Sequence, residues 1–305
     1  MKWKEIINSI NKETIFLDMV KSECTIHKNE IVFTIGSCFV REIEERLTDL
    51  VRFPVLKYKG NEFETHAGRN RGILNQFTPD SMIRELLWAK NTIENQKVFE
   101  KETSTTFEYV IDDDNIIDIG LHMPLPITRD RFLHRRKIIL DIYKEISVSE
   151  SIIITVGNIE NHFLDDGRMI ESISTNKNFL KKEKNIKALK PAKYDLSCKL
   201  KELHGLLRYL NKEARIILTV SPIPMSRNDI GDHIIVENFY NKILLVDTVR
   251  DLCQHETNTF YFPSFEFVNF IGISAFKEDL RHIKTEIIDL IVNGFKKMTS
   301  LDINN

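Results

Sequence analysis

The stretch Ile31-Val32-Phe33-Thr34-Ile35-Gly36-Ser37-Cys38-Phe39-Val40 decides the fold. Its first half, Ile31–Ile35, is continuously apolar and rich in β-branched residues, which is typical of a strand covered on both faces. After Gly36-Ser37, apolar residues recur at helical spacing, at Phe39, Ile43 and Leu47. The stretch therefore predicts a buried strand, a tight turn and a helix.

Similar apolar runs return at three later places. Ile152–Val156 and Ile216–Val220 are continuous and β-branched, and Thr259–Phe262 is aromatic and ends at Pro263. Between the runs lie amphipathic stretches whose apolar residues are spaced as on a helix: Ile138, Ile142 and Ile146; Leu196, Leu200, Leu203, Leu207 and Leu210; and Ile283, Ile287, Leu290, Ile291 and Phe295. Strands alternating with helices favour an α/β fold with a mostly parallel central sheet and helices on both faces.

Length and composition predict a single domain. The chain has 305 residues, of which 42% are hydrophobic, and this is enough for one large core. We expect one domain over residues 1–305, with surface insertions near 57–80, 98–120 and 165–194. The sequence of the second insertion, 98–120, predicts a short hairpin around Asp112–Asn115. The third is rich in lysine, and its position directly after a strand leaves open whether it is a solvated loop or covers a site.

Charge and cysteine content exclude several classes of protein. The formal net charge is -2, so no global field favours binding to nucleic acid or to an anionic membrane surface. The four cysteines form no C-x-x-C pair, which argues against a zinc site or a disulfide framework. The N-terminus has no apolar segment of a secretory signal, and no apolar run is long enough to span a membrane. We therefore expect a cytoplasmic protein without a metal or organic cofactor.

The residues after each predicted strand carry the chemistry, because ligands of open α/β sheets bind at the carboxyl ends of the strands. Ser37 follows the first strand, and Gly157-Asn158-Ile159-Glu160-Asn161-His162 follows the second. Ser221 follows the third strand, and Asp279-Leu280-Arg281-His282 precedes the last helix. A serine at a strand-to-helix turn is exposed to substrate, an imidazole can accept its proton, and a carboxylate can orient that imidazole. Ser37, His282 and Asp279 are thus a candidate catalytic triad.

Each of these signals also has a purely structural interpretation. A serine that opens a helix is usually an N-cap, as is the aspartate of an Asp-x-x-His sequence. Asn158 is a residue type that closes turns. Cys38 is a possible nucleophile because thiols at helix starts can have a lowered pKa, although we expect it to serve in packing. The joint order of the signals along an α/β chain favours chemistry.

The motifs resemble those of the GSCFA family. Gly36-Ser37-Cys38-Phe39-Val40 is similar to that family's signature, with Val in place of Ala. Further segments resemble the family in the same order, namely Thr155-Val156-Gly157, Thr219-Val220-Ser221-Pro222-Ile223-Pro224 and Tyr261-Phe262-Pro263-Ser264-Phe265-Glu266. The family looks like a branch of the SGNH (GDSL-like) hydrolases. The resemblance implies a three-layer α/β/α, flavodoxin-like fold that acts on acyl esters, often of carbohydrate.

The resemblance also implies roles for individual residues. Ser37 matches the nucleophile, and Asp279 and His282 match the final Asp-x-x-His block. In that superfamily the oxyanion is held by the nucleophile's own N–H, by a glycine and by an asparagine. This gives Ser37, Gly72 and Asn158 as candidate oxyanion donors, with Asn75 as an alternative to Gly72. The pattern departs at the third donor because Asn158 directly follows Gly157, and Asn161 and His162 are alternatives there. We expect four further side chains to contact substrate, namely Asn75, Asn161, His162 and Ser221.

Three functions remain open at this stage. The first is a serine esterase, either a carbohydrate O-deacetylase or a small-ester hydrolase, and it is the function that we favour. The second is an O-acyltransferase that uses the same triad on a glycan hydroxyl. The third is a non-catalytic glycan-binding or assembly protein. A nucleotide-binding protein is disfavoured because the Gly36-Ser37 turn matches neither the G-x-G-x-x-G nor the P-loop pattern. The sequence gives no oligomeric state.

Overall fold

A parallel sheet of four strands forms the centre of the molecule. The computed structural model describes residues 17, 19–21, 23–60, 69–122, 124–171 and 186–301. The sheet has the order β1-β4-β8-β9, and all three neighbouring pairs are parallel. Its strands are β1 (Val32–Gly36), β4 (Ser151–Val156), β8 (Arg215–Val220) and β9 (Thr259–Phe262). The four predicted strands are therefore confirmed, and their carboxyl ends lie at one edge.

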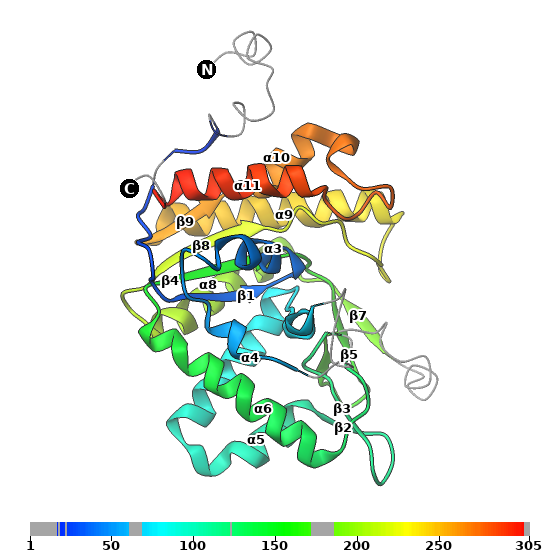
Figure 1. Cartoon of the computed structure of the whole chain (residues 1–305). Coiled ribbons are helices and arrows are strands. Elements are labelled where there is room, and N and C mark those ends of the chain that lie inside the picture. Colours follow the sequence, from blue (N-terminus) through cyan, green and yellow to red (C-terminus); the bar gives the residue numbers. More distant parts are fainter. Residues whose placement is uncertain are drawn as a thin grey trace, which may run out of the picture.

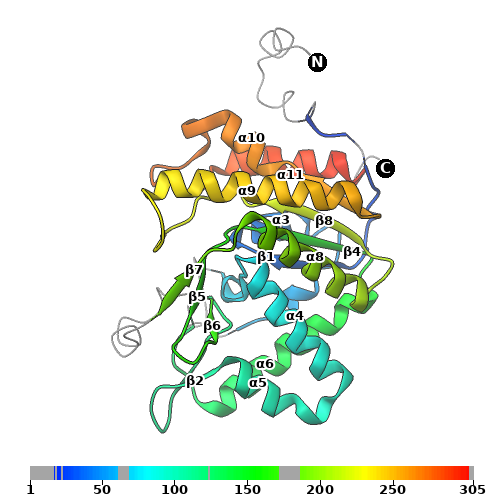
Figure 2. The same cartoon turned by 180° about the vertical axis from the view of Figure 1, so that it is seen from behind.

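Helices cover both faces of this sheet (Figures 1 and 2). Successive residues of a strand point to opposite faces, so in β4 the side chains of Ile152 and Ile154 pack into one core and that of Ile153 into the other. The first core is closed by α4 (Pro79–Glu94), α6 (Arg129–Lys144), α8 (Lys193–Leu210) and α9 (Ile234–His255). The second is closed by α3 (Cys38–Leu47), α10 (Ser264–Ile271) and α11 (Thr285–Met298). The predicted three-layer α/β/α architecture is confirmed.

Local sequence explains where the helices begin. The hydroxyl of Thr78 accepts a hydrogen bond from the backbone N–H of Ser81 in a reciprocal capping box, and Pro79 occupies the first turn of α4. Thr128 caps α6 in the same way. The described part of the chain also contains α5 (Phe99–Phe107) and short 3₁₀ helices at Pro54–Lys57, Asn70–Leu74, Gln96–Val98, Glu145–Val148 and Gly272–Ala275.

The predicted insertions form smaller elements beside the sheet. The predicted hairpin is confirmed as the antiparallel pair β2 (Glu108–Val110) and β3 (Ile116–Asp118). Both ends of the lysine-rich insertion join a second small sheet, made of β5 (Asn161–Phe163), β6 (Met169–Ile170) and β7 (Lys187–Leu189). Residues 61–68 of the first insertion and 172–185 of the third lie outside the described residues. The division into one domain with three insertions stays a prediction.

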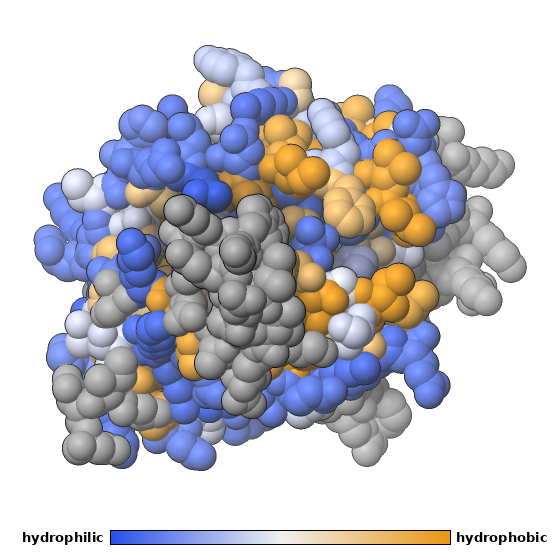
Figure 3. All heavy atoms as spheres, turned by 90° about the horizontal axis from the view of Figure 1, so that it is seen from above, coloured by the Kyte–Doolittle hydropathy of each residue, from blue (hydrophilic) through white to orange (hydrophobic). Residues whose placement is uncertain are grey.

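The outer surfaces of α9, α10 and the 3₁₀ turn after α10 carry many apolar side chains. Figure 3 looks onto this side of the molecule, where apolar patches interrupt the hydrophilic surface. The exposed apolar residues of α9, α10 and the following 3₁₀ turn are Ile235, Val236, Phe239, Tyr240, Ile243, Phe270 and Ile273. None of the described helices is both long enough and apolar enough to cross a membrane.

Candidate active site

A cleft of about 550 Å³ opens at the carboxyl ends of the strands. It is lined by residues that follow β1, β4 and β8, by the first part of the lysine-rich insertion and by the turn before α11. Six of the predicted site residues line it, namely Ser37, Asn158, Asn161, His162, Ser221 and His282. The chain therefore brings residues from opposite ends of the sequence to one cavity.

Ser37 lies at the floor of the cleft, in the turn between β1 and α3. Gly36 has a φ of +144°, and a Cβ at this position would collide with the backbone oxygen and nitrogen of Thr155, so that only glycine fits. The Ser37 hydroxyl caps α3 by accepting a hydrogen bond from the N–H of Phe39 at 3.4 Å. It also bonds to the Thr155 hydroxyl at 3.0 Å, and Ser37 is 1% exposed. The sheet itself thus fixes the serine.

Asp279 and His282 form a self-contained turn before α11. One oxygen of the Asp279 carboxylate accepts the backbone N–H groups of Arg281 and His282, at 3.0 and 2.9 Å. The other oxygen bonds to Nδ1 of the His282 ring at 2.5 Å. The hydrogen bond from the His282 ring, together with those two N–H groups, holds the pKa of Asp279 well below its usual range. The carboxylate therefore stays charged and orients the imidazole.

Within the described part of the chain, no hydrogen bond joins the Ser37 hydroxyl to His282. The serine oxygen bonds to Thr155, whereas the His282 side chain is 51% exposed at the cleft wall. Ile283, the next residue, is buried in the core beneath and anchors the turn. In enzymes without bound substrate, hydrogen bonds between catalytic groups are often long or poorly aligned. Ser37 and His282 line the same cavity.

Asn158 presents an amide donor to the cleft. Its side-chain oxygen accepts the backbone N–H groups of Ile159 and Glu160, at 2.9 and 3.3 Å, which fixes the orientation of the amide. The Nδ2 group has no hydrogen-bond acceptor among the residues that the structure describes. The backbone N–H groups of Gly157 and Asn158 both donate to the Phe77 carbonyl, at 2.9 Å each. The cleft thus contains one fixed amide N–H₂ group close to the strand ends.

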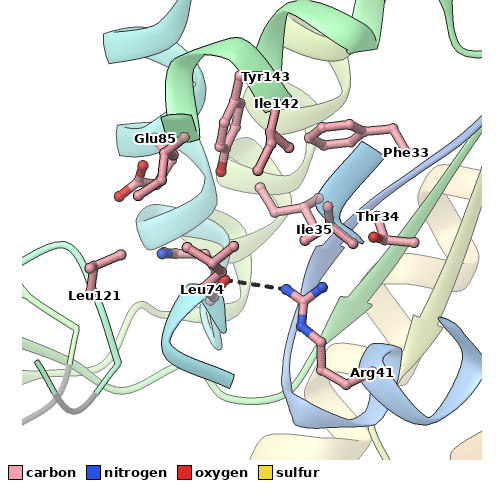
Figure 4. A pocket seen from close by; sticks show the side chains of 12 residues that line it. Phe33, Thr34, Ile35, Arg41, Leu74, Glu85, Leu121, Ile142 and Tyr143 are labelled. Atoms are coloured by element: carbon pink, nitrogen blue, oxygen red, sulfur yellow. Dashed lines mark hydrogen bonds between the residues drawn. The ribbon is translucent and has the colours of Figure 1, made fainter. Parts of the chain in front are cut away.

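Gly72 and Asn75 do not line the cleft. The N–H of Gly72 donates to the Arg69 carbonyl within a 3₁₀ turn, at 3.0 Å. Asn75 is fully buried, and its side-chain oxygen accepts a hydrogen bond from Arg41 at 3.1 Å. Figure 4 shows Arg41 reaching toward Leu74 at a small interior cavity of about 20 Å³. The sequence around Gly72 and Asn75 does not show that this turn points into the core.

The backbone N–H of Ser37 is also engaged, because it donates to the Thr155 carbonyl at 3.0 Å. By contrast, the N–H of Cys38 is the first of α3, and helix geometry leaves it without an intrahelical acceptor. Burial raises the pKa of the Cys38 thiol, which disfavours the nucleophilic thiolate. Cys38 therefore offers the cleft a backbone donor rather than a reactive side chain.

The other predicted contacts are held by neighbouring residues. The Asn161 amide accepts a hydrogen bond from Thr78 at 2.6 Å and donates to Asp80 at 2.8 Å. The Ser221 hydroxyl accepts the N–H of Ile223 at 3.4 Å. These side chains shape the wall of the cleft, and Ser221 is 1% exposed.

One cluster at the cleft has metal-ligand residue types. The ligand atoms of Glu160, His162 and Asp229 lie within 4.8 Å of one another. However, each carboxylate already has a cation beside it. Lys190 lies 3.4 Å from Glu160, and Arg227 lies 2.6 Å from Asp229. These ion pairs offset the negative charge that would attract a metal ion, and we interpret the cluster as a network that joins the insertion to the cleft wall.

A buried lysine that the sequence analysis did not single out lies beneath the strand ends. Lys242 of α9 is 1% exposed, and its ammonium group donates to the carbonyls of Gly157 and Ser221 at 2.7 Å each. Burial lowers the pKa of Lys242 to about 7. The residue ties together the loops after β4 and β8. Nothing in the sequence of α9 indicates that Lys242 bonds to these two loops.

Comparisons with known proteins give a family and remote structural similarities. A Clostridium thermocellum family 3 carbohydrate esterase has a TM-score of 0.36 at 10% identity, with 90% of this chain and 96% of that chain covered. A carbohydrate esterase family 3 structure from Talaromyces cellulolyticus has a TM-score of 0.35 at 11% identity, with 87% and 94% covered. No curated protein matches the sequence. The GSCFA family model matches residues 31–295. The chain therefore belongs to the GSCFA family.

Proposed function

We propose that the protein is a serine esterase that cleaves acyl esters through Ser37, His282 and Asp279. One observation carries the proposal: a helix-capping serine after β1 and an aspartate-oriented histidine before α11 open into the same cleft. The serine is fixed by the sheet and the imidazole by its aspartate, and this is the preorganisation that a nucleophile and its base require. The resemblance of the motifs to SGNH hydrolases agrees with this function.

The proton transfer follows from the arrangement of the three side chains. His282 uses Nδ1 to bond to Asp279, so that Nε2 is left to accept the Ser37 proton. As substrate enters, the Ser37 hydroxyl exchanges its bond to Thr155 for one to the imidazole and attacks the ester carbonyl. Asp279 stabilises the imidazolium that forms. His282 then returns the proton to the leaving alcohol, and water resolves the acyl-enzyme.

Two donors of the cleft are suited to the oxyanion of the tetrahedral intermediate. They are the Nδ2 group of Asn158 and the backbone N–H of Cys38 at the start of α3. The positive end of the helix macrodipole adds to the second donor. We assign the oxyanion to the backbone N–H of Cys38 rather than to the predicted N–H groups of Ser37 and Gly72. Both of those groups already donate hydrogen bonds to backbone carbonyls. Loss of the Asn158 donor is expected to cost about 3 kcal/mol of transition-state stabilisation.

The size and lining of the cleft favour a sugar ester. A volume of about 550 Å³ accommodates a ligand of the size of a substituted sugar, and many of its lining side chains are polar. The substrate class that we propose is O-acylated carbohydrate, with removal of the acyl group by water. Transfer of the acyl group to a second sugar would use the same acyl-enzyme.

Hydrolysis of acetylated sugars and short aryl esters tests the proposal. Ser37→Ala is expected to reduce kcat/KM to background, and a serine-reactive phosphonate is expected to label Ser37 in the folded wild type. Ser274→Ala is the matched control, because this exposed serine lies outside the lining of the cleft and its hydroxyl donates to the Ile271 carbonyl of its own turn. Adding a sugar acceptor separates the two reactions, since a transferase forms acylated acceptor faster than free acid.

Two results would contradict the esterase. Full activity in Ser37→Ala would exclude the serine as nucleophile. Absence of both turnover and phosphonate labelling in correctly folded protein would favour a non-catalytic binding protein on the same fold.

A further inference from the structure

Most charged side chains in the described lining of the cleft have a partner of opposite charge. Glu42 pairs with Arg69 at 2.7 Å, Glu160 lies 3.4 Å from Lys190, and Arg227 pairs with Asp229 at 2.6 Å. Burial raises the pKa of Glu171 to about 8, so this carboxyl adds little negative charge near neutral pH. Arg281 also lines the cleft, yet it has no carboxylate partner within the ranges that the structure describes. Arginine is always charged in proteins, so the described lining of the cleft includes a positive charge without a carboxylate beside it.

Arg281 is held in a defined position by its neighbours. Its Nε donates to the Pro224 carbonyl at 3.2 Å, and its backbone N–H donates to Asp279 at 3.0 Å. The two terminal nitrogens have no described acceptor, and the side chain is partly exposed. They form the planar fork that binds carboxylate or phosphate in a bidentate manner. Arg281 and His282 both line the cleft, so a group bound by this fork would share the cleft with the proposed catalytic base.

A second basic residue near Arg281, Lys242, also brings no carboxylate to this part of the protein. Lys242 is buried and bonds to two carbonyls rather than to a carboxylate. Burial and the positive charge of Arg281 both lower the pKa of Lys242, to about 7. Lys242 does not line the cleft, so an anion that enters would meet the guanidinium of Arg281 rather than the buried amine.

We propose that Arg281 binds a carboxylate or phosphate group of the substrate, so that the cleft selects acyl esters of anionic sugars over neutral ones. This inference rests on the proposed esterase function for its choice of substrate. The two anions share one chemistry, namely planar pairs of charged oxygens that match the guanidinium fork.

Selectivity between matched acetyl esters tests the inference. The substrates are acetylated glucuronic acid, acetylated glucose 6-phosphate and acetylated glucose, and the readout is the ratio of kcat/KM for each anionic ester to that for the neutral one. We expect a ratio above one in the wild type and a fall of about 10- to 100-fold in Arg281→Gln, since a charge-assisted hydrogen bond is lost. The larger of the two ratios identifies carboxylate or phosphate as the preferred group.

Arg227→Gln is the matched control, because this arginine also lines the cleft but already has a carboxylate partner. Its selectivity ratio is expected to equal that of the wild type. Arg281→Lys keeps the charge and loses the fork, so we expect an intermediate ratio. An unchanged ratio in Arg281→Gln, or an equal fall in Arg227→Gln, would overturn the inference.

Binding measurements separate this inference from the esterase. Glucuronate, glucose 6-phosphate and glucose are titrated into wild type and Arg281→Gln by calorimetry. Tighter binding of an anionic sugar that is lost in Arg281→Gln would support the anion site even if no ester were hydrolysed. Ester hydrolysis that depends on Ser37, with no preference for anionic sugars in binding or in turnover, would refute the anion site and leave the esterase intact.

Discussion

The two halves of the candidate site are built in opposite ways. Ser37 is 1% exposed and is fixed by the sheet, through Gly36 and the backbone and hydroxyl of Thr155. The Asp279 and His282 side chains are 49% and 51% exposed, and the hydrogen bonds that orient them come from their own turn. One half depends on long-range packing, and the other depends on four consecutive residues.

Because of this difference, substitutions in the two halves should affect folding stability and catalytic activity to different extents. A change near the serine disturbs contacts between β1 and β4, which belong to both cores of the molecule. A change in the aspartate turn disturbs few contacts outside that turn. We therefore expect the effect of substitutions on folding to decline from the serine side to the histidine side, whereas their effect on catalysis need not decline.

The largest effect on stability is expected from Gly36→Ala. The methyl group would collide with the backbone of Thr155, and alanine rarely adopts a φ of +144°. Strain and overpacking together should cost roughly 4 kcal/mol. Thermal unfolding followed by circular dichroism checks this. Gly205→Ala is the control, because nothing lies within 4 Å of the added methyl group in α8, and it should stabilise the protein by about 1 kcal/mol.

Lys242→Met is expected to have the second largest effect. The substitution leaves the buried carbonyls of Gly157 and Ser221 without donors, which should cost about 3 kcal/mol. Urea unfolding at neutral pH measures the loss. An unchanged unfolding free energy would show that the two loops do not depend on the lysine.

The pH dependence of Lys242→Met sharpens this prediction. The pKa of Lys242 is about 7 in the folded protein, below its ordinary value of 10.5. Between these two values the unfolded chain binds a proton that the folded chain does not, so this group raises wild-type stability as pH increases. The methionine variant lacks the effect. The difference in unfolding free energy between the two proteins should therefore be larger at pH 9 than at pH 6.5, and a constant difference would contradict the lowered pKa.

The strands and the serine turn could be predicted because their signals are local. The apolar runs at β1, β4 and β8 are too continuous for any exposed element, and Gly36-Ser37 marks the end of the first. The helix α9 was harder to identify because its exposed face is itself apolar, at Ile235, Phe239 and Ile243. Such a surface removes the polar stripe that identifies an amphipathic helix.

The parts of the site that escaped prediction depend on contacts between distant segments. Gly72 and Asn75 have suitable chemistry, but a 3₁₀ turn directs them toward the core. Arg281 lay within the quoted Asp279–His282 motif, yet its unbalanced charge becomes evident only when the other charges of the cleft are paired. Lys242 reaches the strand ends from a helix whose sequence carries no motif. Chemistry at these positions is set by packing rather than by local sequence.

A smaller effect on stability is expected from Gly157→Ala. An added Cβ would lie 3.1 Å from the Cβ of Ser37 and 3.6 Å from the ring of Phe77, which is tight but leaves room for small shifts. We expect a loss of about 1 kcal/mol of stability. The displaced serine should lower kcat more than it raises KM, because the attack geometry is disturbed. Steady-state kinetics of ester hydrolysis, beside thermal unfolding, test the two effects separately.

The smallest effect on stability, with a large effect on activity, is expected from Asp279→Asn. Asparagine retains the oxygen that accepts the N–H groups of Arg281 and His282, so the turn should be kept, and the unfolding temperature should fall less than in any variant above. It removes the charge that stabilises the imidazolium, and kcat should fall by about 10²- to 10⁴-fold. Asp251→Asn is the matched control, because Asp251 also pairs with a histidine, His255, at 3.5 Å on exposed α9. That control should change neither quantity. Equal activity in the two variants would mean that the pair before α11 is an ordinary surface contact, because the charge of a catalytic aspartate must matter in the transition state even where it contributes little to folding.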